Sequence, residues 1–331
     1  MKRIVALLLA GVLATVACAG WLAWFAAQPL ALRASPLEVT VAPGSSARSA
    51  ARQIAAAGVP MQPWQFELLA RALGQDGGFK AGTYLLESGI TPRGLLDKLV
   101  RGEVALTEIV FVEGWTFRQM RAALAAHAHL KHETTEASAT EVMARLGADG
   151  IAPEGRFFPD TYRFARGTSD LEVLRMAYRA MQGRLEAAWA ARAEGLPLAS
   201  PDEALILASI VEKETGRAED RALIAAVFVN RLRAGIRLQS DPTVIYGIGE
   251  RFDGNLRRRD LERDAPYNTY TRAGLPPTPI AMPGLASLQA VLNPAASDAL
   301  YFVARGDGSS EFSRTLQEHN RAVTKYQRGG R

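Results

Sequence analysis

Ala204-Leu-Ile-Leu-Ala-Ser-Ile-Val-Glu-Lys-Glu-Thr-Gly216 joins an apolar run directly to a pair of glutamates. The apolar run is typical of a buried helix, and 3.6 residues per turn place Glu214 over Ile210 and Val211. A carboxyl group fixed to the apolar face of a helix is difficult to ionise, so its pKa should rise from about 4.3 towards neutrality. A general acid that works near neutral pH needs such a pKa, which makes Glu214 the first candidate catalytic residue.

The neighbouring glutamate, Glu212, lies in a different direction from the same helix. Two residues correspond to a rotation of roughly 200°, so Glu212 should lie over Ala208 and Ser209, away from the apolar stripe. We expect its carboxylate to be solvated. The helical pattern therefore singles out Glu214 rather than the pair.

The composition limits the classes of function. The chain has 331 residues, of which 48% are hydrophobic, enough for two packed domains beyond an anchor. Its 39 basic and 34 acidic residues are interspersed, without the basic stripe and aromatics of a nucleic-acid-binding protein. The net charge of +5 suits an anionic membrane or an acidic wall polymer.

A single cysteine and four histidines without an HExxH arrangement predict neither a disulfide framework nor a metal site. We expect no cofactor.

The N-terminal segment predicts the compartment. Met1-Lys2-Arg3 precedes an uncharged run from Ile4 to Ala27, long enough to cross a bilayer as a helix. Trp21 and Trp24 lie at its far end, where interfacial aromatic residues belong. Residues 1–27 are therefore expected to be a cytoplasmic tip and a single-pass inner-membrane anchor, with the body outside the membrane. The alternative is a signal peptide cleaved at Ala17-Cys-Ala19, which would leave an apolar new terminus.

Two domains are expected after a linker at residues 28–36. Residues 37–105 predict a strand, two helices and a returning strand, an order that resembles a LysM-type glycan-binding module. A generic small α+β domain without a ligand is the alternative. Residues 106–331 predict a larger mixed α+β domain that ends in a hairpin. The fold class is therefore α+β, with a transmembrane helix, a small βααβ module and a catalytic domain.

Loops rich in Pro, Gly, Asn, Tyr and Thr fill residues 239–294 and could form a sugar cleft around Glu214. Leu238-Gln-Ser-Asp-Pro-Thr-Val-Ile-Tyr246 and Ala265-Pro-Tyr-Asn-Thr-Tyr270 combine carboxylate, amide, hydroxyl and aromatic groups. This mixture binds sugar hydroxyls and stacks on sugar rings. The structural alternative makes Asp241 a turn residue and the tyrosines partly buried loop anchors.

Several long motifs follow one another at characteristic spacing. Together they resemble the endolytic murein transglycosylases of the YceG-like family. The longest are Ala208-Ser-Ile-Val-Glu-Lys-Glu-Thr215, Val227-Phe-Val-Asn-Arg-Leu232, Leu238-Gln-Ser-Asp-Pro-Thr-Val-Ile-Tyr-Gly247 and Tyr267-Asn-Thr-Tyr-Thr271. Shorter matches include Phe79-Lys-Ala-Gly-Thr-Tyr84 and Phe158-Pro-Asp-Thr-Tyr162, so the resemblance extends over nearly the whole chain.

The resemblance implies cleavage of peptidoglycan strands between N-acetylmuramic acid and N-acetylglucosamine without water. Glu214, the second glutamate of Glu-Lys-Glu, would protonate the glycosidic oxygen and then deprotonate the 6-hydroxyl of the same muramyl residue. That hydroxyl would close onto C1 and leave a 1,6-anhydro end. The resemblance also implies substrate contact by Gln239, Asp241, Thr243, Tyr246, Tyr267, Asn268, Thr269 and Tyr270.

Two rival functions remain open. A hydrolytic muramidase would use water and generally two carboxylates about 5 to 9.5 Å apart, for which Asp241 is the only serious partner of Glu214. A non-enzymatic, membrane-anchored wall-binding scaffold would leave Glu214 as an unusual buried acid. The family resemblance favours the lytic enzyme, which would reside beside cell-wall synthases and terminate nascent glycan strands.

Overall fold

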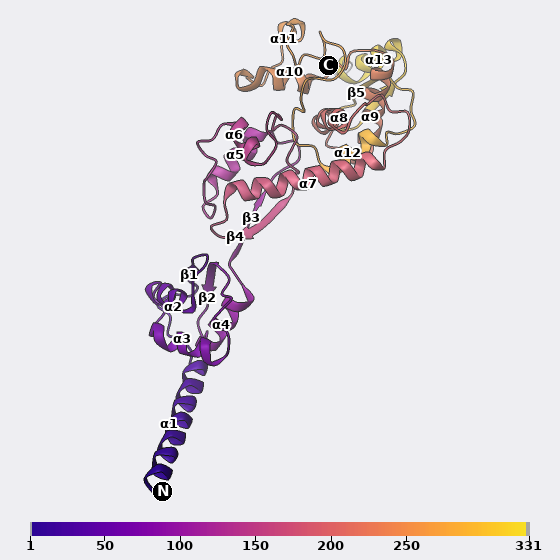
Figure 1. Cartoon of the computed structure of the whole chain (residues 1–331). Coiled ribbons are helices and arrows are strands. Elements are labelled where there is room, and N and C mark those ends of the chain that lie inside the picture. Colours follow the sequence, from indigo (N-terminus) through magenta and orange to yellow (C-terminus); the bar gives the residue numbers. More distant parts are fainter. Residues whose placement is uncertain (1, 329–331) are drawn as a thin grey trace. The chain divides into compact units, whose positions relative to one another are not determined.

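The computed structural model describes residues 2–328 and has a mixed α+β fold, as predicted (Figure 1). The chain forms two compact units. The first contains the chain up to Thr107 together with Arg163–Thr168, and the second contains Glu108–Tyr162 and the chain from Ser169 onward. Strand β3 (Leu106–Val110) pairs with strand β4 (Thr161–Ala165), and the boundaries between the units fall within these two strands.

Helix α1 (Lys2–Ala27) is apolar along its length, with a mean hydropathy of 2.3 over its most apolar window. Its 26 residues correspond to about 39 Å, which exceeds the roughly 30 Å of a bilayer core. Large apolar side chains from Ile4 to Val16 are exposed. By length and composition this helix could cross a membrane.

The first unit contains the predicted strand–helix–helix–strand order. Its elements are β1 (Leu37–Val41), α2 (Ala47–Ala56), α3 (Pro63–Ala72), β2 (Gly82–Leu86) and α4 (Pro92–Arg101). The strands are antiparallel, with Leu37 opposite Leu86 and Val41 opposite Gly82. Helices cover one face of this small sheet and bury its inward-facing residues, Val39 and Tyr84 among them. The likeness to a LysM-type module stays a prediction.

Residues 28–36, expected to be a linker, are attached to this unit. Leu30 is buried in its core, and the Leu30 N–H donates to the carbonyl of Ile90 at 2.8 Å. Phe25, near the end of α1, is also part of the core, with only 8% of its surface exposed. Helix α1 and residues 28–36 are therefore packed onto the first unit.

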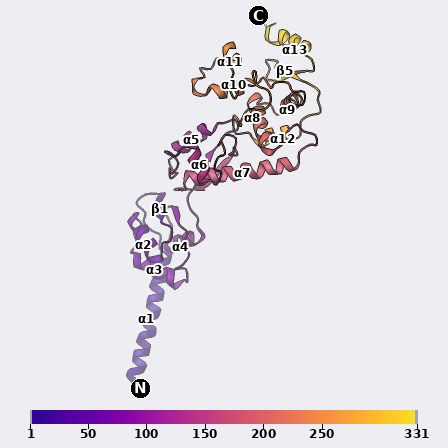
Figure 2. The same cartoon turned by 45° about the horizontal axis from the view of Figure 1, so that its top comes forward.

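The second unit is built around helix α8 (Pro201–Glu214). Ser200 caps its N-terminus and proline occupies its first turn, as such residues do at helix starts. Leu205, Leu207, Ile210 and Val211 have no exposed surface. Three helices pack against α8 and lie around it in both views (Figures 1 and 2): α7 (Asp170–Ala190), α9 (Ala218–Arg233) and α12 (Leu285–Leu292).

Smaller elements complete the second unit. Helices α5 (Phe117–Ala126) and α6 (Ala139–Arg145) precede α7, and α10 (Asp241–Ile248), the 3₁₀ turn Gly249–Arg251 and α11 (Arg258–Glu262) lie in the loop-rich third. The predicted closing hairpin is present as β5 (Tyr301–Ala304) and β6 (Ser310–Ser313), which pair antiparallel. Helix α13 (Leu316–Val323) and the π-helical turn Thr324–Arg328 follow.

Gly155 allows one close contact in this unit. Its φ of +78° lies in the left-handed region, and a Cβ added there would be 2.5 Å from the Cβ of Pro279. A side chain at this position would therefore be disfavoured both by the backbone conformation and by the packing against Pro279.

We expect Gly155→Ala to destabilise the protein through both effects. The left-handed conformation should cost about 1–2 kcal/mol, and the contact with Pro279 a further 1–3 kcal/mol. Gly150→Ala is the matched control, because its φ is +74° but no atom lies within 4 Å of its added Cβ. Denaturant unfolding of both variants measures the difference, and equal losses would contradict the packing argument.

Candidate functional site

Glu214 is the last residue of α8, where the buried helix reaches a groove. The residue is partly exposed, whereas its carboxyl group is surrounded by protein atoms. Its Oε1 accepts a hydrogen bond of 2.6 Å from the Ser240 hydroxyl. Burial raises the pKa of Glu214 to about 7, with a further contribution from the charge of Asp241, while Ser240 and Arg231 act in the opposite direction. The direction is the one expected for a carboxyl on an apolar helix face.

The groove has a volume of about 530 Å³ and brings together residues from α8, α9, the loops around α10, the closing hairpin and α13. Three of the sequence-predicted contact residues, Gln239, Asp241 and Tyr270, line it together with Glu214. Tyr301 of β5 and His319 of α13 are also in its lining. These groups can surround a polar ligand next to the candidate acid.

Asp241 is the second carboxylate of this groove. It is the first residue of α10, and its Oδ1 accepts a 2.6 Å hydrogen bond from the Tyr270 hydroxyl. Burial and this hydrogen bond raise the pKa of Tyr270, so the phenol remains a donor at neutral pH. The Asp241-Pro242 pair thus begins a helix and also presents a carboxylate to the groove.

The side chains of three other predicted contact residues are buried: Thr243, Asn268 and Thr269. The Thr269 hydroxyl accepts from the Ser240 N–H at 3.0 Å and lies 2.9 Å from the Thr243 hydroxyl. The Asn268 amide donates to the carbonyls of Asp260, Leu261 and Arg263. Their polar groups hold the loops that carry Ser240, Asp241 and Tyr270.

Arg231 of α9 is a residue that sequence reasoning did not select. Only 8% of its surface is exposed, and its guanidinium donates to the carbonyls of Leu238 at 2.8 Å and Leu300 at 2.7 Å. It also donates to Oε1 of Gln239 at 3.4 Å. Gln239 has a φ of +51°, a strained conformation for a residue other than glycine. The only sequence signal for Arg231 was its place in the Val227–Leu232 motif.

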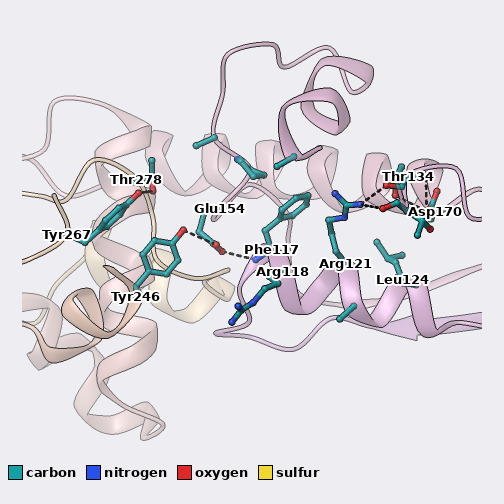
Figure 3. Close-up of a pocket in the computed structure, with 16 residues that line it drawn as sticks. Phe117, Arg118, Arg121, Leu124, Thr134, Glu154, Asp170, Tyr246, Tyr267 and Thr278 are labelled. Carbon is teal, nitrogen blue, oxygen red and sulfur yellow. Dashed lines mark hydrogen bonds between the residues drawn. The ribbon is translucent and has the colours of Figure 1, made fainter. Parts of the chain in front are cut away.

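Tyr246 and Tyr267 line a second cavity of about 660 Å³ (Figure 3). Their rings are 4.9 Å apart, and the Tyr246 hydroxyl donates to Oε2 of Glu154 at 3.1 Å. The other oxygen of Glu154 accepts from the Phe117 N–H at 3.0 Å. Burial raises the pKa of Glu154 to about 7. Helix α10 connects the two cavities, because Asp241 and Tyr246 are separated by a rise of only about 7.5 Å along it.

The expectation that Glu212 is solvated was wrong. Its Oε2 accepts hydrogen bonds from the Gly284 N–H at 3.0 Å and the Ser287 hydroxyl at 2.7 Å, at the start of α12. Unpaired N–H groups at a helix N-terminus favour a carboxylate, so Glu212 joins the last turn of α8 to α12. Among residues 2–328, no group of three or more His, Cys, Asp or Glu side chains is placed to hold a metal ion.

The sequence and the structure of this chain are similar to those of known proteins. The model of the YceG-like family matches residues 39–325. The endolytic murein transglycosylase of Bacillus subtilis (strain 168) is 34% identical over 274 residues, which cover 75% of this chain and 73% of that protein. The endolytic murein transglycosylase of Streptococcus pneumoniae serotype 2 is 29% identical over 281 residues, covering 75% and 50%. The crystal structure of a yceG-like protein from Listeria monocytogenes has a TM-score of 0.53 and 29% identity, and the match covers 87% of this chain and 98% of that one.

The raised pKa of Glu214 predicts a stability effect that depends on pH. The folded state holds this proton up to about pH 7, whereas the unfolded chain releases it near pH 4.5, so the free energy of unfolding falls as pH rises between these values. Glu214→Gln should therefore stabilise the protein by about 1–3 kcal/mol at pH 8 and have little effect near pH 4. Denaturant unfolding at both pH values tests this, with the exposed Glu186→Gln as control. An equal effect at both pH values would exclude a titrating Glu214.

Proposed function

This chain belongs to the YceG-like family, and we propose that it is an endolytic murein transglycosylase, a lyase that cleaves within peptidoglycan glycan strands. The bond cleaved joins N-acetylmuramic acid to N-acetylglucosamine, and the product ends in a 1,6-anhydromuramyl residue. The observation that carries this proposal is the carboxyl group of Glu214, which lines a polar groove and whose pKa burial raises to about 7.

Glu214 performs both proton transfers in this reaction. In its neutral form it gives a proton to the glycosidic oxygen as the bond from that oxygen to C1 breaks. In its ionised form it then takes the proton of the 6-hydroxyl, whose oxygen bonds to C1. A pKa near 7 allows one group to serve as acid and then as base at neutral pH, and such catalysis typically supplies about 10²- to 10⁴-fold. Ser240 orients the carboxyl group through its 2.6 Å hydrogen bond.

Asp241 stabilises the positive charge that develops on the sugar ring. Its carboxylate lines the same groove as Glu214, and the Tyr270 hydroxyl holds one of its oxygens. A fixed negative charge near the reacting carbon favours an oxocarbenium-like transition state. Because the 6-hydroxyl of the substrate is the nucleophile, Asp241 does not have to attack C1. Gln239, held by Arg231, is placed to contact the sugar.

The second cavity accommodates glycan beyond the cleaved bond. Tyr246 and Tyr267 offer aromatic edges and hydroxyl groups there, a chemistry suited to sugar rings. Helix α10 brings this cavity next to the groove of Glu214. Two polar cavities next to each other can hold several consecutive sugars, which suits cleavage within a strand.

Helix α1 anchors the protein in the inner membrane, with Lys2 and Arg3 on the cytoplasmic side and the body in the extracytoplasmic space. This placement brings the enzyme to glycan strands as they leave their synthases, which are the expected partners. Residues 37–105 bind glycan in the manner of a LysM module. Cleavage at this location terminates strand elongation.

Product analysis tests the reaction directly. The full chain in detergent should convert uncrosslinked glycan strands into fragments with anhydro ends, identified by mass spectrometry. Glu214→Gln should reduce the rate by at least about 10²-fold, because the variant can neither donate nor accept the proton. Products heavier by one water would indicate a hydrolase, and full activity of the variant would reject Glu214. Wall binding without any product would favour the scaffold function.

The pH profile tests the electrostatics of the groove. Glu214 must begin each cycle protonated, so kcat/KM should fall as pH rises through about 7. Asp241→Asn removes a charge that raises the pKa of Glu214, and should move this fall to lower pH. Ser240→Ala removes a donor to the carboxylate and should move it to higher pH. Shifts of both variants in the same direction would contradict this account.

A further inference from the structure

The end of α1 and helix α3 form one packed body. The ring of Trp21 is stacked on two others, on Phe25 with a centroid distance of 5.9 Å and on Trp64 with a distance of 5.5 Å. Phe25 and Trp21 belong to α1, whereas Trp64 belongs to α3. Leu22 and Ala26 also pack against the core of the unit. This column of three aromatic rings fixes α3 relative to the axis of α1.

The length of α1 determines the depth of this column in a membrane. A hydrocarbon core of roughly 30 Å corresponds to about 20 helical residues, so an uncharged run that begins at Ile4 leaves the core near residue 23. Trp21 and Trp24 then lie at the outer boundary, where tryptophan is preferred. Because the ring of Trp64 is 5.5 Å from that of Trp21, it lies within the polar interfacial layer, which is about 5 to 7 Å thick on each side.

The outer face of α3 has the chemistry of an interfacial helix. Trp64 is 55% exposed and Leu68, one turn further on, is 36% exposed. The opposite face buries Phe66, Leu69 and Ala70 in the core of the unit. Trp24 of α1 is 60% exposed, so α1 also carries an exposed tryptophan close to its end. Helix α1 enters the unit beside α3 and α4 (Figures 1 and 2).

We propose that the outer face of α3, formed by Trp64 and Leu68, docks on the outer surface of the membrane that α1 crosses. The occupant of this face is the boundary between lipid headgroups and acyl chains, since the aromatic column holds Trp64 at that depth. The unit that contains α3 therefore contacts the surface of the bilayer directly. This inference rests on the anchoring role given to α1 above.

The test uses the full chain in vesicles of phosphatidylethanolamine and phosphatidylglycerol. In a Cys18→Ser background, a fluorescent label is attached at Leu68→Cys or, as the matched control, at Ala42→Cys. Ala42 is exposed and directly follows β1, at the opposite end of this strand from the segment 28–36 that connects it to α1. The label at position 68 should be quenched by lipids with a shallow quencher and protected from aqueous iodide, and the label at 42 should behave oppositely.

Vesicle flotation separates failure of the inference from failure of the anchor. A chain that does not float with the vesicles is not anchored, which overturns both the anchoring role of α1 and this inference. A chain that floats but shows equal iodide quenching at positions 68 and 42 is anchored with its module away from the bilayer, which overturns only the inference. Adding Trp64→Gln to the Leu68→Cys chain should weaken the protection from iodide while flotation persists, because the interfacial tryptophan of α3 is lost.

Discussion

The burial of α8 on all sides is the constraint on which the site depends. An apolar helix enclosed by α7, α9 and α12 cannot rotate or slide without opening the core, so the position of its last residue is fixed. Glu212 reinforces this by binding the start of α12. The protein thereby holds one carboxyl group at a defined point of a groove, with a pKa set mainly by the same burial. Rigid packing and acid strength have a single structural origin.

The groove is assembled from features that do not favour stability by themselves. Arg231 is a buried cation, Gln239 has a strained backbone, and Glu214 and Glu154 are carboxyl groups in positions that disfavour their ionised forms. The surrounding packing and hydrogen bonds compensate, since Arg231 satisfies several carbonyls at once. Strain and buried charge often accumulate at functional sites because function requires geometry that an unconstrained chain would avoid.

Local pattern predicted the features that depend on neighbouring residues in sequence. Periodicity indicated α1, the β1–α2–α3–β2 order and the face of α8 that carries Glu214. The sequence could not indicate the partners of Arg231, because the Leu300 carbonyl is far along the chain. Asn268 and Thr269 have the polar groups of a sugar-binding loop, yet those groups bond to nearby main chain and side chains. Glu212 was misjudged for the same reason: its partners, Gly284 and Ser287, come from a distant helix.

The contact of Phe25 with the module core has a practical consequence for preparing a soluble form of this protein. Membrane proteins with one anchor are commonly truncated at the end of the apolar run, which here would remove everything up to Ala27. Such a fragment would lose Phe25 and Ala26 from the core, and would expose apolar surface of that core that is buried in the intact chain. Fragments that retain the last two turns of α1 should be better folded and less prone to aggregate. The N-terminal limit of the first folded unit is thus set by packing rather than by hydropathy.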